Sequence, residues 1–71
     1  MITFDPLWRT LQARSMNKTE LQKLTGLSSA TIAKLSKNEA ADSVMLEVVD
    51  RICKALAVPI YDVVQSISDK E

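Results

Sequence analysis

The fold of this chain is decided by residues 16–38, which read MNKTELQKLTGLSSATIAKLSKN. Asn17, followed three residues later by Glu20, has the spacing of a capping box, in which each side chain accepts a hydrogen bond from the other residue's backbone N–H. Gly26 can adopt the positive φ that ends a helix and turns the chain. Ser28 is suited to cap a second helix. The stretch therefore predicts two short helices joined by a tight turn.

The second of these helices has two unlike faces. Ile32 and Leu35 fall on one face with Thr31 at its edge, and we expect them to point into the core together with Leu27. Asn38 is the expected left-handed stop. The opposite face carries small, polar and cationic side chains, namely Ser29, Ala30, Ala33, Lys34 and Lys37. Such a face suits a DNA groove.

Residues 21–35, with Gly26, Ser28, Thr31 and Ile32 in place, resemble the helix-turn-helix of the phage repressor and Cro family, also called the xenobiotic-response-element (XRE) family. The likeness extends over about residues 5–65. The resemblance implies an all-α, lambda-repressor-like bundle of five short helices, with the helix-turn-helix at helices 2 and 3. It also implies that the second motif helix enters the major groove of double-stranded DNA.

The N-terminal segment predicts one more helix. Asp5 and Pro6 form a cap and first-turn pair, so a helix is expected from Pro6 to about Arg14. Its apolar stripe consists of Leu7, Trp8 and Leu11. Trp8 could stack on a base, but its spacing from the two leucines favours the core. Residues 1–4 form an arm that could pack on the core or on a partner.

Two further helices are expected after residue 38. Asp42 or Ser43 would cap a fourth helix that runs to about Ala57. This helix has more apolar positions than one core-facing stripe needs, so a second side of it would also be covered. Pro59 would open a fifth helix, with a stripe formed by Ile60, Val63, Val64 and Ile67, and the tail from residue 68 would fray.

Composition limits the class of protein. Seventy-one residues, 46% of them hydrophobic and one of them glycine, fit a single compact domain. No apolar run is long enough for a membrane span and no signal pattern opens the chain, so a cytoplasmic, nucleoid-associated protein is expected. Cys53 is the single cysteine and is expected in the core rather than as a reactive thiol.

The net charge is zero, but the charges are divided along the chain. Residues 9–37 carry six cations and one anion, a balance of +5: Arg9, Arg14, Lys18, Lys23, Lys34 and Lys37 against Glu20. Residues 38–71 carry seven anions and three cations, a balance of −4, and Asp5 completes the sum. The cationic half contains the motif and could neutralise phosphates, although ordinary solvated charges would give the same count.

The resemblance implies DNA contacts at Lys18, Ser29, Ala30 and Lys34. Side-chain chemistry extends this set, because Ser29 and Thr31 can hydrogen-bond base edges or phosphates, and Ala30 can contact a thymine methyl. Lys37 and Arg14 are expected at phosphates. The candidate DNA-binding residues are therefore Lys18, Ser28, Ser29, Ala30, Thr31, Lys34, Lys37 and Arg14.

A sequence-specific transcriptional regulator, acting as a repressor, is the expected function. Reading two half-sites calls for a homodimer, and the apolar surplus of helices four and five supplies candidate interface residues: Val48, Val49, Ile60, Val64 and Ile67. The chain has no histidine, no cysteine pair and no glycine-rich phosphate loop, so we expect no enzyme, no metal and no cofactor. The alternative is a protein-interaction module on the same scaffold, such as an antitoxin-like partner.

Overall fold

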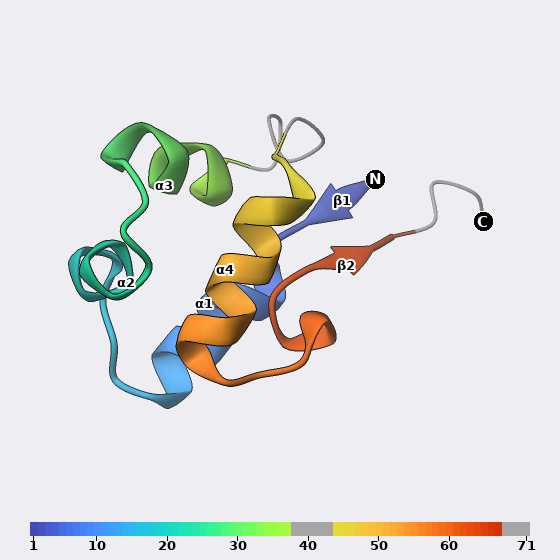
Figure 1. Cartoon of the computed structure of the whole chain (residues 1–71). Coiled ribbons are helices and arrows are strands. Elements are labelled where there is room, and N and C mark those ends of the chain that lie inside the picture. Colours follow the sequence, from blue (N-terminus) through green and yellow to red (C-terminus); the bar gives the residue numbers. More distant parts are fainter. Residues whose placement is uncertain (38–43, 68–71) are drawn as a thin grey trace.

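A computed structural model describes residues 1–37 and 44–67. The elements in chain order are β1 (Ile2–Thr3), α1 (Asp5–Ala13), α2 (Lys18–Thr25), α3 (Ser29–Ser36), α4 (Leu46–Leu56), the 3₁₀ turn η2 (Ile60–Asp62) and β2 (Gln65–Ser66) (Figure 1). No helix in these two ranges is long and apolar enough to cross a membrane.

The local signals around the motif are confirmed. Glu20 N–H donates to Asn17 Oδ1 at 2.8 Å, and Asn17 N–H donates to Glu20 Oε1 at 2.9 Å, so the capping box is complete. Gly26 ends α2 with φ of 74°. Ser28 caps α3, since its Oγ accepts from the Thr31 N–H at 3.2 Å. These short-range contacts set where α2 and α3 begin and where α2 ends.

Thr25 adds a contact to the turn that the sequence pattern did not predict. Its buried hydroxyl donates to the Leu21 carbonyl at 2.8 Å and accepts from the Leu27 N–H at 3.3 Å. Leu27 is buried, as expected, whereas Leu24 is 51% exposed and lies off the core side of α2. One hydroxyl therefore links the last turn of α2 to the residue after Gly26.

All the helices contribute to one core. Its members are Phe4, Leu7, Leu11, Leu21, Leu27, Ile32, Leu35, Val49, Ile52, Leu56 and Val63. Trp8 and Cys53 are half-buried against this core, in agreement with their expected places. Burial raises the pKa of the Cys53 thiol, and the nearby Asp50 carboxylate raises it further, so the thiol stays protonated.

The N-terminal arm packs on the core, which answers the question left open by the sequence. Phe4 is 1% exposed and is itself the N-cap residue of α1. The expectation that Asp5 caps this helix is wrong, because Asp5 is its first residue and donates its N–H to Thr3 Oγ1 at 3.2 Å. Burial of Phe4 sets where the helix starts.

The fourth helix starts later than expected. Met45 is the N-cap of α4, without a side-chain capping bond, so the prediction of a cap at Asp42 or Ser43 is wrong. Those two residues and the expected stop at Asn38 lie outside the described residues. At its other end α4 stops at Ala57, which adopts a left-handed φ of 56°. Val49, Ile52 and Leu56 form its buried stripe.

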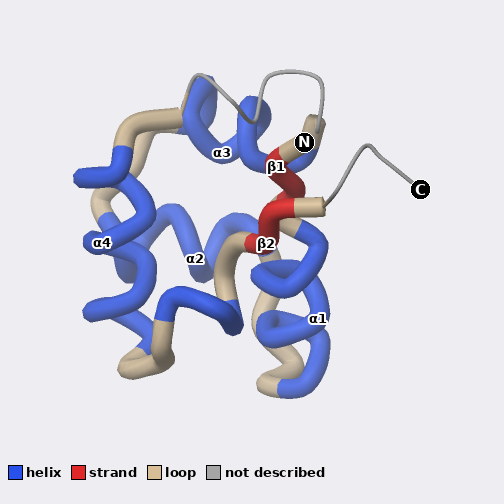
Figure 2. The backbone as a smooth tube through the Cα atoms, turned by 90° about the vertical axis from the view of Figure 1, so that its right-hand side faces the viewer, coloured by secondary structure: helices blue, strands red, loops and turns tan. Residues whose placement is uncertain are grey.

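The expected fifth helix is the largest error. Ile60–Asp62 make one 3₁₀ turn, after which Gln65–Ser66 pair with Ile2–Thr3 as an antiparallel ribbon. Beyond the ribbon, Ile67 N–H donates to the Met1 carbonyl at 2.7 Å. The two strands lie side by side against the helices (Figure 2). The backbone N–H and C=O groups of Ile2–Thr3 pair with those of Gln65–Ser66, and a fifth helix could not use these partners. The rest of the fold is helical, as expected.

Candidate nucleic-acid interface

The exposed face of α3 forms the centre of the candidate site. Ile32 and Leu35 are buried and anchor the helix to the core, so the rest of its surface faces outward. Thr31 is half-buried at the edge. The exposed residues of this segment are Ser28, Ser29, Ala30, Ala33, Lys34, Ser36 and Lys37. The two-faced pattern expected from the sequence is therefore present in the structure.

The hydroxyls at the start of α3 are already engaged with each other. Ser28 Oγ lies 3.0 Å from Thr31 Oγ1 and also accepts from the Thr31 N–H. Ser29 and Ala30 are exposed as well, and the Ser29 hydroxyl has no hydrogen bond to another described residue. Ser29 is therefore the hydroxyl of the first turn that is freest to meet a base or a phosphate.

The lysines of the candidate set are exposed and make no ion pair with any residue in ranges 1–37 and 44–67. Lys34 lies in the last turn of α3, and Lys37 is its C-cap. Lys18 is the first residue of α2, and its Nζ lies 5.3 Å from the centroid of the Trp8 ring. An ion pair of 3.1 Å joins Lys54 and Asp50 within α4. Among the described residues, no carboxylate therefore competes with phosphate for Lys18, Lys34 or Lys37.

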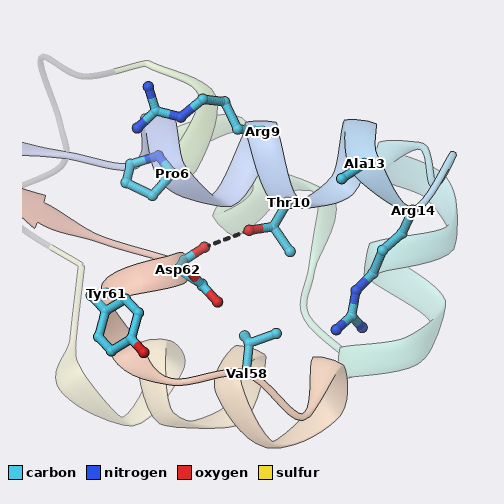
Figure 3. A pocket seen from close by; sticks show the side chains of 8 residues that line it. All are labelled: Pro6, Arg9, Thr10, Ala13, Arg14, Val58, Tyr61 and Asp62. Carbon is cyan, nitrogen blue, oxygen red and sulfur yellow. Dashed lines mark hydrogen bonds between the residues drawn. The ribbon is translucent and has the colours of Figure 1, made fainter.

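Arg14 lies elsewhere. Its Nη1 donates to the Leu56 carbonyl at 2.7 Å, which ties the end of α1 to the end of α4. It lines a hollow of about 400 Å³ between α1 and the segment after α4 (Figure 3). Thr10 Oγ1 donates to the Asp62 carbonyl at 2.8 Å across the same hollow. The structure thus gives Arg14 a bond within the fold.

A small hollow beside α3 was missed by sequence reasoning. It measures about 130 Å³ and is lined by Thr31, Lys34, Val44, Met45 and Val48. Met45 is 66% exposed and Leu46 is 79% exposed, so the start of α4 presents apolar side chains near α3. The sequence predicts surplus apolar residues on α4. Which of them lie beside α3 depends on the residue at which α4 begins.

The expected dimer residues do not all reach the surface. Val49 is 4% exposed, so its assignment to an interface is wrong: it belongs to the core-facing stripe of α4. Val48 and Val64 are half-buried. Ile60 and Ile67 are exposed, and the neighbouring Tyr61 is exposed as well.

An α2–turn–α3 unit that leaves a cationic second helix uncovered defines a helix-turn-helix DNA-binding domain. The chain belongs to the Cro/C1-type helix-turn-helix DNA-binding domain family, whose model matches residues 6–69. This membership confirms the resemblance inferred from residues 21–35, and the family is one of DNA-binding domains rather than of enzymes.

A solved structure supports the same assignment. The chain is similar to the crystal structure of the transcriptional regulator VanUg, Form II, with 35% sequence identity and a TM-score of 0.83. The match covers 96% of this chain and 87% of that chain. A comparison with curated proteins gives no match.

Proposed function

We propose that this protein regulates transcription by binding a specific site in double-stranded DNA, and that it represses by occupying a promoter. The observation that carries the proposal is the exposed, carboxylate-free face of α3, held on the core by Ile32 and Leu35. The similar structure of VanUg is that of a transcriptional regulator. Such a protein works at the nucleoid in the cytoplasm.

Each contact follows from side-chain chemistry. Ser29 and Ala30, in the first turn of α3, would meet base edges or a thymine methyl, and Lys34 would reach a guanine edge or a phosphate. Lys18 and Lys37 would bind phosphates, which position the protein without reading sequence. Ser28 and Thr31 would mainly hold the start of α3, because their hydroxyls already bond each other. Arg14 is left out of this surface, because it bonds the Leu56 carbonyl.

The proposed active species is a homodimer. One α3 helix reads only a few base pairs, whereas two related by a two-fold axis read half-sites about one helical turn, roughly 34 Å, apart. Exposed apolar side chains favour this assembly. We propose Ile60 and Ile67, with the half-buried Val64 and Val48, as its contacts.

The test is a selection from random duplex DNA at two salt concentrations. Wild type should enrich a two-fold symmetric motif, and the Lys18→Ala/Lys34→Ala variant should lose it. Because each phosphate contact contributes about 0.9 to the slope of log affinity against log salt, the variant's slope should fall by up to about 2. Lys54→Ala is the matched control, since Lys54 is an exposed lysine paired with Asp50 on α4. Equal binding by all three proteins would refute the proposal.

The apolar start of α4 favours one alternative, a protein-interaction module. Leu46 and Met45 expose large apolar side chains that DNA binding does not require. Partner binding would depend weakly on salt and would be lost on Leu46→Ser, whereas DNA binding would survive that change. The salt slope and this variant together separate the two functions.

A further inference from the structure

The single tryptophan lies beside one of the proposed phosphate contacts. Lys18 Nζ is 5.3 Å from the centroid of the Trp8 ring. A cation within about 6 Å of an indole face is attracted by the negative electrostatic potential above the ring. The two residues come from different helices, α1 and α2, so the contact spans the turn between them.

The core holds the Trp8 ring, whereas Lys18 lies at the surface. Trp8 is half-buried and packs against the core, while Lys18 is exposed. A lysine side chain loses much rotamer freedom when it is held in one place. Lys18 makes no ion pair with any other described residue, so the Trp8 ring is the group that restricts it.

We propose that Trp8 is a positioning residue for DNA binding, which holds the Lys18 ammonium at the start of α2 where a phosphate would lie. This inference rests on the proposed function and specifies how Lys18 takes part in it. The ammonium carries three donors, and the ring occupies only one side of it, so ring and phosphate can be met together. DNA then binds a lysine that is already ordered.

The first test needs no DNA. Ring currents above an indole move nearby protons upfield in the NMR spectrum. The Lys18 ε-methylene protons should therefore be shifted upfield in wild type and should return to ordinary values in Trp8→Leu. Ordinary values in folded wild type would overturn the proposal.

The second test is a double-mutant cycle. It measures the affinity of each variant for a duplex that carries the DNA sequence enriched in the selection. Trp8→Leu should weaken binding about 2- to 5-fold, the range that a partly exposed cation–π contact supports. In a Lys18→Gln background the same change should have no further effect. In a Lys34→Gln background it should keep its full effect, which makes Lys34 the matched control.

Thermal unfolding of each variant is the control that tests whether the variant is folded at the temperature of the binding measurement. Trp8→Phe keeps an aromatic face and should retain most of the affinity. This variant can also be measured if Trp8→Leu does not fold. An equal loss from Trp8→Leu with and without Lys18 would mean a structural role and would overturn the proposal.

The outcomes also separate this inference from the function on which it rests. If wild type binds no duplex while the Lys18 protons remain shifted, the proposed function fails and the use of Lys18 fails with it. If wild type binds and the cycle shows no coupling, only the role of Trp8 is overturned.

Discussion

Residues 17–36 and residues 57–67 reach their structures by different means. The first segment is fixed by neighbours: Asn17 with Glu20, Gly26 at the turn, and Ser28 with Thr31. The second takes its shape from distant partners on β1 and α1. The reading motif is therefore encoded locally, whereas the segment that closes the fold depends on the rest of the chain.

The helix-turn-helix and the C-terminal segment therefore contribute differently to the stability of the fold. The helix-turn-helix can keep its internal geometry through caps and the glycine, yet its helices are only 8 residues long. Helices shorter than about 12 residues are marginal in isolation, so their stability comes from packing. The C-terminal segment supplies part of that packing through Val63, which is fully buried.

Among the substitutions that test this comparison, Phe4→Ala should have the largest effect on the free energy of unfolding. Phe4 is buried where the arm, α1 and the shared core meet, and truncation of a buried phenylalanine costs about 3–5 kcal/mol. In a domain of this size that loss approaches the whole free energy of unfolding. Urea unfolding should show it, and Leu24→Ala, at a half-exposed apolar position inside the motif, should change stability by less than about 1 kcal/mol.

A smaller effect is expected from Arg14→Ala. The change removes the bond from the guanidinium to the Leu56 carbonyl at the C-terminal end of α4, which should destabilise the fold by about 1 kcal/mol. Affinity for the selected duplex should stay within about twofold, because the Arg14 guanidinium bonds the Leu56 carbonyl within the fold. Arg9→Ala, in the same hollow, is the control and should leave stability unchanged. A loss of salt-dependent DNA binding in Arg14→Ala would restore Arg14 to the interface.

Two of the residues with a left-handed backbone conformation, Gly26 and Ala57, sharpen the comparison further. Gly26 has a φ of 74° with nothing near its missing Cβ, and Ala57 has a φ of 56°. Gly26→Ala should therefore cost about 1 kcal/mol through backbone strain alone. Ala57→Gly should stabilise by roughly 0.5 kcal/mol, because the strain relieved exceeds the added chain entropy. Thermal melts should move in opposite directions, and a stabilising Gly26→Ala would contradict the account.

The smallest effect concerns pH and Cys53. The pKa of the folded thiol is raised above its ordinary value of 9.0 by burial and by Asp50, so the folded state keeps its proton longer than the unfolded chain does. This contribution to stability is complete below pH 9.0 and decreases as the pH rises above it. Wild type should therefore lose slightly more stability than Cys53→Ala between pH 8 and pH 10 in paired denaturant titrations. Parallel curves for the two proteins would contradict the prediction.

The sequence predicted most of the structure where the signals were short-range. The capping box, the positive φ of Gly26, the cap of α3 and its buried Ile32–Leu35 stripe follow from residues a few positions apart. The contacting face of α1 was likewise predictable from helical spacing, whereas the sequence did not single out one buried stripe on α4.

The features that the sequence did not predict depend on contacts between residues that are far apart in the chain. A stripe of Ile60, Val63, Val64 and Ile67 fits a helix, yet Ile60–Asp62 form one 3₁₀ turn and Gln65–Ser66 pair with the arm as a strand. Arg14 has the chemistry of a phosphate contact, and only the fold brings it to the Leu56 carbonyl. Val49 and Val48 are adjacent in sequence, but the rotation of α4 buries the first and leaves the second half-exposed.

The ribbon between β1 and β2 also bears on the order in which the molecule assembles. Met1 and Ile67 exchange hydrogen bonds across 66 positions of sequence, so closing this contact costs more chain entropy than any turn between the helices. Contacts of that kind form late in folding, after local helices have condensed. They also open by local fluctuation while the core stays intact, so the Ile67 amide should exchange with solvent deuterium well before the amides of α2. We therefore expect the two ends of the described chain to assemble last and to come apart first.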